Sequence, residues 1–415
     1  MRLAPGTPLA VSMAFDQSRP EQPVGRLAMA NGMAQLEWSA NVVAAALPVA
    51  PLLYPPEPGL LSARGREFEG LHGFLADSLP EGWGYLVMRR RLARLGVAIE
   101  TLSPLDRLAL IGGNGRGALT YQPATAPAPE IGSLDLDALA LEARTILAGK
   151  EGELAATLAT LAGGSGGARP KVHVGFDQAG QVSVADGEVA DGHEAWIVKF
   201  PGPSDPPDIG PIEGAYAAMA HAAGLQMAPF RLIPARSGPA YFATHRFDRP
   251  RPGERLHMVS LSGAVEAPWR VPASYDLLLR ATLAITRHAA DVEAAFRRMV
   301  FNVLACNRDD HTRQHSFLMD EAGQWRLAPA YDLTHSAGPG GEHYLDIEGE
   351  GRAPTEAHVL ALGHRHGLAE RTITAMISEV RAAVADWPLY AREAGVSRAS
   401  REAVEQAHVA VARQF

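Results

Sequence analysis

The chain has 415 residues, of which 47% are hydrophobic and 20% are charged. This composition is typical of a folded globular protein and excludes the disordered and collagen-like classes, and the length predicts two or three domains. The formal net charge of −8 excludes the overall positive field on which nonspecific nucleic-acid binding depends. We therefore expect contact with DNA only through a local patch or a partner protein.

The start of the chain and its cysteine content predict where it is found. The single cysteine, Cys306, cannot form an internal disulfide, and the first residues lack the charged start and apolar run of a signal peptide. The longest apolar run, residues 40–53, is interrupted by Asn41 and two prolines and is shorter than the roughly 18 residues that a membrane span needs. These features predict a cytoplasmic protein without a membrane anchor.

Residues 1–129 are predicted to form an N-terminal α/β domain. Residues 34–38 alternate like a strand, and residues 81–96 carry apolar side chains at helical spacing. The stretch 123–129, PATAPAP, has no hydrophobic period, and its prolines favour an extended backbone. This stretch therefore predicts a linker at the end of the domain.

The remaining chain is predicted to form two lobes, a β-rich small lobe over 130–250 and a helical large lobe over 251–415. The small lobe is expected to contain a helix at 134–161, a glycine-rich turn at 163–167, strands at 171–176 and 195–200, a helix at 211–224 and a strand at 240–245. The large lobe is expected to contain helices at 274–287, 291–305, 355–367 and 369–385, interrupted by a polar segment at 307–337. We find no internal repeat, which argues against a solenoid.

The glycine-rich turn is a candidate phosphate-binding loop. Four glycines between residues 163 and 167 give a backbone that can approach phosphates closely and direct its amide N–H groups at them. A flexible linker is the alternative for a Gly/Ser run of this kind. Direct entry into the alternating strand 171–176 favours the phosphate loop.

Lys199 stands in the otherwise apolar strand 195–200, where an unpaired ammonium group is costly to bury. Glu213, fourteen residues later near the start of the next helix, is the predicted partner, because such a Lys–Glu pair holds nucleotide phosphates in kinases. The alternative is that Lys199 extends its charged end from an edge strand into water.

The densest polar cluster, residues 307–317, is a candidate phosphoryl-transfer site. Such a site needs a carboxylate to orient the attacking hydroxyl group and oxygen ligands to hold Mg²⁺. Asp309, Gln314 and Asp332 supply these groups in the order found in kinases. A solvated loop is the alternative for any charged stretch, but Asp332 lies in the less polar segment 327–333, where a carboxylate needs a cation or hydrogen bonds.

These residues resemble the HipA family of bacterial toxin kinases. The resemblance covers nearly the whole chain and rests on five segments in the family's order: 74–82 (FLADSLPEG), 166–171 (GGARPK), 246–249 (RFDR), 307–317 (NRDDHTRQHSF) and 327–333 (LAPAYDL). It implies an α+β fold, with a two-lobed kinase-like part preceded by an N-terminal α/β domain. It also implies an ATP-dependent serine/threonine protein kinase that inhibits growth, uses Mg²⁺, and binds a HipB-like helix-turn-helix antitoxin through which it contacts DNA indirectly.

The resemblance also assigns roles by position. Asp309 is the expected catalytic aspartate and Asp332 the expected magnesium ligand, with Gln314 as a further metal ligand. The expected nucleotide-binding residues are Gly164, Ser165, Gly166, Gly167, Lys171, Lys199, Glu213, His245, Phe247 and His311, with His245 and Phe247 at the adenine hinge. Apart from the resemblance, His311 is expected to steady the loop by hydrogen bonds.

Two positions depart from the family's pattern. Gln314 stands where the family usually has asparagine, so its amide reaches a cation from a shifted position. Gly164 stands where self-phosphorylating members carry serine, and we expect any self-phosphorylation to fall on the neighbouring Ser165.

Two other functions fit parts of the sequence. Because of Gln314, the chain is compatible with a pseudokinase that binds an antitoxin and acts in repression. A metal-dependent phosphohydrolase could use Asp309, Asp310 and His311, but it would leave Lys199 and the glycine-rich turn unexplained. The arginines at 89, 90, 91 and 94 are predicted to form a solvated helix face, and Cys306 is predicted to be a core residue.

Overall fold

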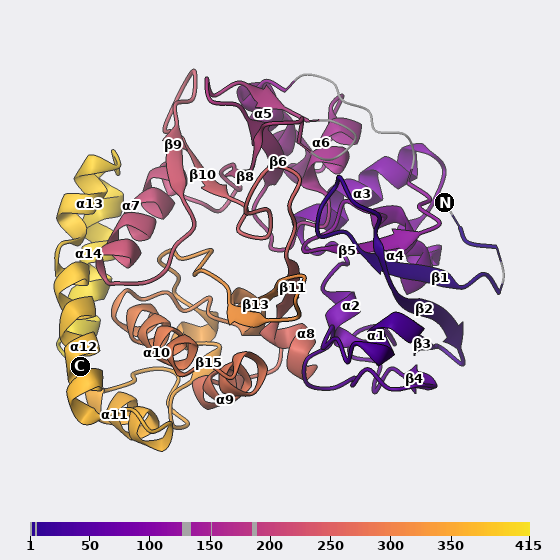
Figure 1. Ribbon diagram of the computed structural model, residues 1–415. Coiled ribbons are helices and arrows are strands. Elements are labelled where there is room, and N and C mark those ends of the chain that lie inside the picture. The colour runs from indigo at the N-terminus through magenta and orange to yellow at the C-terminus, as the bar shows by residue number, and fades with distance from the viewer. Residues whose placement is uncertain (1, 5, 127–133, 151, 185–188) are drawn as a thin grey trace. The chain divides into compact units, whose positions relative to one another are not determined.

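The computed structural model describes residues 2–4, 6–126, 134–150, 152–184 and 189–415 (Figure 1). The chain divides into two compact units. Unit 1 comprises Met1–Asp205, Ala243–Val259 and Leu318–Gln324, and unit 2 comprises Pro206–Phe242, Ser260–Phe317 and Trp325–Phe415. The predicted domain limits at 129 and 250 stay a prediction, and residues 127–129 of the predicted linker lie outside the described residues.

Unit 1 begins with a five-stranded sheet in the order β4-β3-β2-β1-β5, in which every neighbouring pair is antiparallel. One face of the sheet is buried because apolar residues alternate along the strands: Leu27 of β2 lies opposite Leu36 of β3, and both are fully buried. The elements are β1 (Leu9–Met13), β2 (Gln22–Ala30), β3 (Met33–Trp38), α1 (Ala40–Ala44), β4 (Leu60–Ser62), α2 (Gly73–Ala76), α3 (Trp83–Arg94), η1 (Ile99–Thr101), α4 (Pro104–Ile111) and β5 (Leu119–Gln122).

Two helices and three strands follow in unit 1, namely α5 (Leu136–Leu147), α6 (Ala155–Ala162), β6 (Lys171–Phe176), β7 (Val182–Ser183) and β8 (Glu194–Lys199). Strand β6 pairs antiparallel with both β7 and β8. The single helix expected over 134–161 is wrong: α5 ends at Leu147, and Gly149 adopts a φ of +79°, a left-handed conformation that stops a helix. The short helix α6 then leads directly into the glycine-rich turn.

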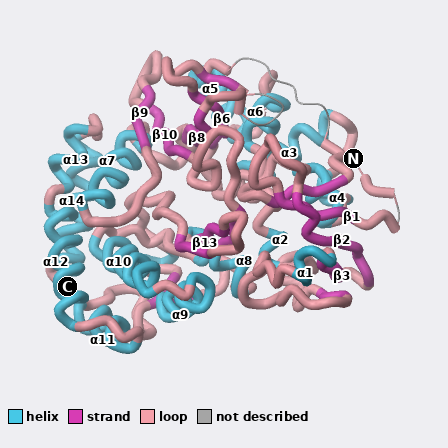
Figure 2. The backbone as a smooth tube through the Cα atoms, in the orientation of Figure 1, coloured by secondary structure: helices cyan, strands magenta, loops and turns pink. Residues whose placement is uncertain are grey.

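Unit 2 is mainly helical (Figure 2). Its helices are α7 (Ile209–Ala222), α8 (Leu261–Val265), α9 (Tyr275–Thr286), α10 (Ala289–Leu304), η2 (Thr312–Gln314), η3 (Pro339–Gly341), α11 (Glu356–Arg365), α12 (Glu370–Ala385), α13 (Trp387–Glu393) and α14 (Arg398–Ala412). Its strands are β9 (Phe230–Ile233), β12 (Ala273–Ser274), β14 (Trp325–Leu327) and β15 (Leu345–Asp346), while β10 (Tyr241–His245), β11 (His257–Ser260) and β13 (Ser316–Met319) cross the division between the units. Helix α10 packs against α9 and α12.

The expected helices of the large lobe are confirmed within three residues at each end, because their apolar side chains recur at helical spacing and are buried. Helices α13 and α14 were not expected from the sequence. Among the described residues, no helix combines the length and the apolar composition required to cross a bilayer.

Candidate active site

In the glycine-rich turn between α6 and β6, the backbone carbonyl groups and the backbone N–H groups differ in their hydrogen bonding. The carbonyl oxygens of Ser165 and Gly167 accept from the backbone N–H groups of Glu81 and Trp83, at 3.3 and 2.9 Å. The Lys171 ammonium group donates to the carbonyl of Gly166 at 2.8 Å. By contrast, the N–H groups of residues 166–168 donate to no acceptor within the part of the chain that the structure describes. Consecutive N–H groups that have no acceptor, next to carbonyls that are already hydrogen-bonded, form a backbone that is suited to binding an anion.

Ser165 is only 2% exposed, and its hydroxyl group is engaged within the turn. It donates to the carbonyl of Ala162 and lies 3.1 Å from Nε2 of His173. The hydroxyl is thus not presented to solvent in this arrangement. Its expected self-phosphorylation stays a prediction that would require the turn to change conformation.

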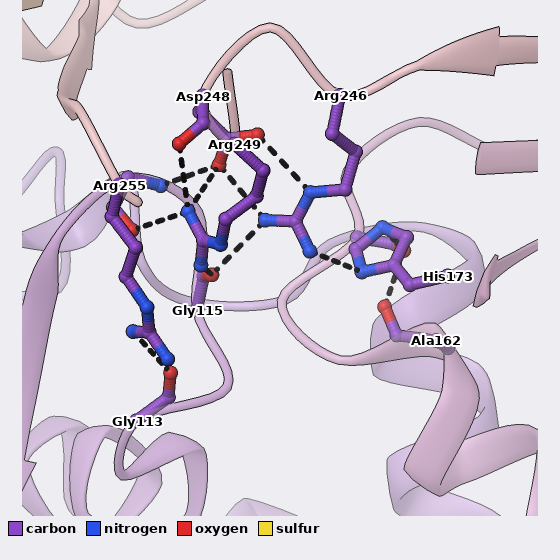
Figure 3. A network of polar contacts seen from close by, with 10 residues as sticks. Gly113, Gly115, Ala162, His173, Arg246, Asp248, Arg249 and Arg255 are labelled. Carbon is purple, nitrogen blue, oxygen red and sulfur yellow. Dashed lines mark hydrogen bonds and ion pairs between the residues drawn. The ribbon is translucent and has the colours of Figure 1, made fainter. Parts of the chain in front are cut away.

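A buried polar network centred on Asp248 connects to the turn through Arg246, His173 and Ser165 (Figure 3). The Asp248 carboxylate accepts from Arg246 at 2.8 Å, from Arg249 at 2.9 Å and from the backbone N–H of Gly117 at 2.9 Å. Burial alone would raise the pKa of Asp248, but the two guanidinium groups outweigh it and hold the pKa far below its ordinary value. Asp248 is therefore a permanently charged anchor that joins the segment 246–249 to the turn 113–117.

Lys171 of β6 and Lys199 of β8 lie directly opposite each other in the antiparallel register. Both lysines are buried, at 9% and 8% exposure. Opposite residues of an antiparallel pair share a face of the sheet, and like charges in this arrangement repel. The two lysines therefore place two positive charges on one face of the sheet in unit 1, and the Lys171 ammonium group reaches the glycine-rich turn through the Gly166 carbonyl.

His245 and Phe247 flank Arg246 at the end of β10. The His245 ring lies 5.6 Å from that of Trp196 in an edge-to-face contact, and burial lowers the pKa of His245. Phe247 is partly exposed between the buried residues Arg246 and Asp248. The structure therefore places both predicted hinge residues in unit 1, with the glycine-rich turn and both lysines, while their contact with adenine stays a prediction.

The polar loop after α10 in unit 2 presents one aspartate and buries the next. The Asp309 side chain is 48% exposed, whereas Asp310 is fully buried. The Asp310 carboxylate accepts from the Tyr275 hydroxyl at 2.6 Å, from Nδ1 of His343 at 2.8 Å and from the Tyr344 N–H at 2.8 Å. Burial alone would raise the pKa of Asp310, but His343 and the hydrogen bonds outweigh it and leave the pKa below its ordinary value. Asp310 therefore anchors the loop from which Asp309 projects.

His311 lies beside Asp309 as a neutral ring. Its Nδ1 accepts from the Arg313 N–H at 3.2 Å, so the ring proton is on Nε2, which lies 3.8 Å from Oδ1 of Asp309. Burial lowers the pKa of His311 to about 4. The ring also contacts Trp269 and Tyr344, with centroid distances of 5.2 and 5.4 Å. These contacts agree with a role for His311 in steadying the loop.

The structure brings Gln314 and Asp332 together, eighteen residues apart in the chain. Nε2 of Gln314 lies 3.2 Å from Oδ2 of Asp332, and Asp332 adopts a φ of +57°, which is rare for a residue other than glycine. A carboxylate and an amide oxygen are donors that suit Mg²⁺, which usually takes one or two protein oxygens together with phosphates and water. The amide group can present its oxygen after a rotation of about 180° of its terminal group. The two residues therefore fit a magnesium site.

Glu213 lies in α7 of unit 2 and is 3% exposed, whereas Lys199 belongs to unit 1. Their pairing stays a prediction. The phosphohydrolase interpretation loses one of its three residues, because Asp310 is fully buried and serves as an anchor. Within the described residues no cluster of three or more His, Cys, Asp or Glu could hold a metal ion.

Two features to which the sequence assigned no function, the arginines of α3 and Cys306, have structural roles. Arg89 pairs with Glu100 at 3.1 Å, Arg91 donates to Thr160 and Arg94 to the Gly152 carbonyl, so much of the basic face of α3 is used within unit 1. Cys306 is 2% exposed, and burial raises its pKa to about 11, which suits a core residue rather than a nucleophile.

Sequence reasoning missed the anchors of both regions, Asp248 with its two arginines in unit 1 and Asp310 with Tyr275 and His343 in unit 2. The signal for the first was the run Arg246–Arg249, in which charged residues directly follow a strand. A second carboxylate beside Asp309 was visible too, but its partners are more than thirty residues away in the chain.

Comparison with known proteins identifies relatives over most of the chain. The descriptions "HipA N-terminal domain" and "HipA-like C-terminal domain" match residues 18–122 and 163–387. The candidate kinase Y4mE of Sinorhizobium fredii is 28% identical over 353 residues, which are 78% of this chain and 72% of the relative. A candidate kinase of Haemophilus influenzae is 30% identical over 103 residues, which are 22% of this chain and 30% of that protein.

A solved structure has the same fold. It is a chain in the complex of the Shewanella oneidensis MR-1 toxin antitoxin system, which contains HipA, HipB and operator DNA. The TM-score is 0.71 at 17% sequence identity, and the alignment covers 98% of this chain and 96% of that one. The predicted α+β, kinase-like fold class is therefore confirmed.

Proposed function

We propose, from the premise that this chain belongs to the HipA-like family, that it transfers the γ-phosphoryl group of ATP to a serine or threonine hydroxyl group of a protein. The family and its candidate kinases support kinase chemistry in general. The observation that carries the finer assignment is the contrast between Asp309, which is half exposed, and Asp310, which is buried and holds the loop in place.

Asp309 would orient the substrate hydroxyl group and accept its proton. A carboxylate in this role must reach solvent and substrate, and its loop must not move when the proton arrives. The three hydrogen bonds to Asp310 meet the second requirement. His311 is neutral at physiological pH and so would add no positive charge beside Asp309 that weakens its carboxylate as a proton acceptor.

Gln314 and Asp332 would hold Mg²⁺, which supplies charge neutralisation at the phosphates when bound. The N–H groups of residues 166–168, with Lys171 and Lys199, would bind the phosphates, and His245 and Phe247 would lie at the adenine.

The direct test is transfer of label from [γ-³²P]ATP to proteins of a cell lysate, with purified wild-type chain and Asp309→Asn compared. We expect labelled serine or threonine with the wild type only. Equal labelling by the variant would contradict the role of Asp309. Slower growth of cells that express the wild type, but not the variant, would support growth inhibition as the output.

A pseudokinase is the second candidate, favoured by the contact of the Gln314 amide nitrogen with Asp332. If Asp332 is satisfied by this amide rather than by a cation, nucleotide could bind without turnover. In that case Mg-ATP would raise the thermal midpoint of the wild type, and no label would be transferred to any protein.

A helix-turn-helix antitoxin is the proposed partner, because the related Shewanella complex contains HipB and operator DNA. The net charge of −8 agrees with contact to DNA only through such a partner. We expect the purified chain alone to leave operator DNA unshifted in a gel-shift assay and to shift it when the antitoxin is added. A shift by the chain alone would contradict indirect contact.

A further inference from the structure

The N-terminal segment 81–84 lies against the glycine-rich turn so closely that two of its residues have no room for a side chain. A Cβ atom on Gly82 would come within 2.3 Å of the Gly167 carbonyl oxygen, and one on Gly84 within 2.5 Å of the Ser165 carbonyl oxygen. Both distances are shorter than van der Waals contact. Glycine at these positions therefore lets the start of α3 touch the backbone of the turn.

Three N–H groups of this segment donate into the turn and the strand after it. The backbone N–H groups of Glu81 and Trp83 donate to the carbonyls of Ser165 and Gly167, and the Trp83 indole Nε1–H donates to the carbonyl of Lys171 at 2.9 Å. We call these three contacts the carbonyl clamp. Trp83 is 1% exposed, so its indole is fixed by packing as well as by this bond.

A second set of contacts holds Ser165 through its side chain. Arg246 can only donate, so the Nδ1 atom of His173, 3.4 Å from Nη1 of Arg246, accepts a hydrogen bond (Figure 3). The neutral ring then carries its proton on Nε2 and donates it in a hydrogen bond to the Ser165 hydroxyl oxygen. The Ser165 hydroxyl group in turn donates to the Ala162 carbonyl. Every member of this chain has one direction of donation, so the turn is held in one conformation.

Whether the turn can bind an anion depends on the direction in which its backbone N–H groups point. A peptide group that rotates exchanges the direction of its N–H and its C=O. Because the clamp fixes the carbonyls of Ser165 and Gly167, it also fixes the following N–H groups of Gly166 and Ala168, which share those peptide planes. These are among the groups that donate to no acceptor in the described part of the chain.

We propose that Trp83, Gly82 and Gly84 of the N-terminal domain position the glycine-rich turn for the phosphate groups of a nucleotide. This inference rests on the proposed function, in which the turn binds the phosphates of ATP. Trp83 is a positioning residue, because it acts on the ligand through the backbone of the turn. The N-terminal domain is then part of the nucleotide site.

The test compares binding of ATP with binding of adenosine, which lacks phosphates, by the full-length chain. In Trp83→Phe the indole donor is lost and most of the aromatic volume is kept. In Gly84→Ala the new Cβ meets the Ser165 carbonyl, although the same change within a helix is ordinarily stabilising. We expect each variant to weaken ATP binding about tenfold, the effect of one turn N–H group that no longer points at the charged phosphates, and to leave adenosine binding within about twofold.

Gly113→Ala is the matched control, because a Cβ there meets only Thr120, at 3.9 Å. Its affinity for both ligands should equal that of the wild type. A thermal unfolding curve of each variant identifies loss of folding, and if Gly84→Ala fails to fold, Trp83→Phe carries the test.

The outcomes separate the inference from the function on which it rests. If the wild type binds ATP no better than adenosine, the phosphate-binding role of the turn is wrong. If the wild type prefers ATP and both folded variants keep that preference, the turn binds phosphate and the positioning role of the N-terminal domain is wrong. Equal weakening of ATP and adenosine would also overturn the positioning role, since it would indicate a general structural effect.

Discussion

Lys171 and Lys199 lie directly opposite each other on neighbouring antiparallel strands of unit 1. The chain contains only three lysines, against thirty-five arginines, and the third, Lys150, is exposed. Two of the three lysines thus lie at one buried place on a sheet. Such a concentration of ammonium groups is suited to binding phosphate, to which lysine binds as a compact point charge.

Chemical labelling of the lysines tests this site directly. Because Lys171 and Lys199 are buried, an amine-reactive reagent should label them more slowly than Lys150 even without nucleotide. We expect Mg-ATP to slow both further, because bound phosphates would cover the ammonium groups, and to leave Lys150 unchanged as an internal control. Mass spectrometry of the digested protein gives all three rates in one experiment. Unprotected Lys171 and Lys199 at saturating ATP would place the nucleotide elsewhere.

Replacing Lys199 by methionine should weaken ATP binding at least about tenfold, since one charge-assisted contact to phosphate is lost. Isothermal titration calorimetry measures the change. Lys150→Met removes the same charge at an exposed position and should bind ATP like the wild type. Equal losses in the two variants would indicate an effect of net charge rather than of position.

The neighbouring aspartates 309 and 310 should respond oppositely to the same substitution. Asp309→Asn should abolish phosphoryl transfer and change the free energy of unfolding by no more than about 0.5 kcal/mol, because its side chain is half exposed. Asp310→Asn should destabilise the protein by about 2–4 kcal/mol, because a buried charge with three donors is lost. Thermal unfolding and label transfer measured on both variants check the pair, and a stable, inactive Asp310→Asn would contradict the anchoring role.

Gln314→Ala should raise the Mg²⁺ concentration needed for half-maximal activity about tenfold, because one oxygen donor beside Asp332 is lost. The measurement is a magnesium titration of label transfer at saturating ATP. Gln324→Ala, at an exposed position, is the control and should titrate like the wild type. An unchanged magnesium titration in Gln314→Ala would show that Gln314 is not a metal ligand and would leave that role to Asp332.

Stability should fall as the pH is lowered from about 6.5 to about 4. Burial lowers the pKa of His72 and His257 in unit 1, and of His408 in unit 2, to about 4 in each case. Within this window the unfolded chain binds protons that the folded chain does not, so the free energy of unfolding decreases with decreasing pH, by up to about 3 kcal/mol per histidine at the acidic end.

Calorimetric midpoints between pH 4 and pH 8 measure this dependence. They should be nearly constant above pH 7, where these histidines are neutral in both states. His257→Gln should reduce the slope, because glutamine can replace the donor to the Val49 carbonyl and does not titrate in this range. A midpoint that stays constant down to pH 4.5 would contradict the assigned burial of these rings.

The elements that the sequence predicted correctly are those that bury a regular apolar stripe. Helices α9, α10 and α12 have five or more buried residues each, and their limits were found within three residues. Helix α14 buries only Val404 and His408, so its stripe is too thin to be recognised by spacing. The break between α5 and α6 depends on the single left-handed residue Gly149, which apolar periodicity does not record.

The residues of the candidate site were predicted by chemistry, whereas their supports were not. Asp309, Gln314 and Asp332 could be singled out because carboxylates and amides near apolar segments are costly without a role. Asp248 bonds Gly117 across 131 residues, and Trp83 bonds Lys171 across 88. Pairings over such distances depend on the completed fold, and no local pattern in the sequence reports them.

The carbonyl clamp also limits how this protein can be divided. A fragment that starts after the proline-rich stretch would keep every lysine and every carboxylate of the candidate site. It would nevertheless lose Glu81 and Trp83, so the carbonyls of Ser165, Gly167 and Lys171 would lose these donors and would accept hydrogen bonds from water. Such a fragment could fold and still hold its glycines in many conformations, so we expect it to bind ATP more weakly than the full chain.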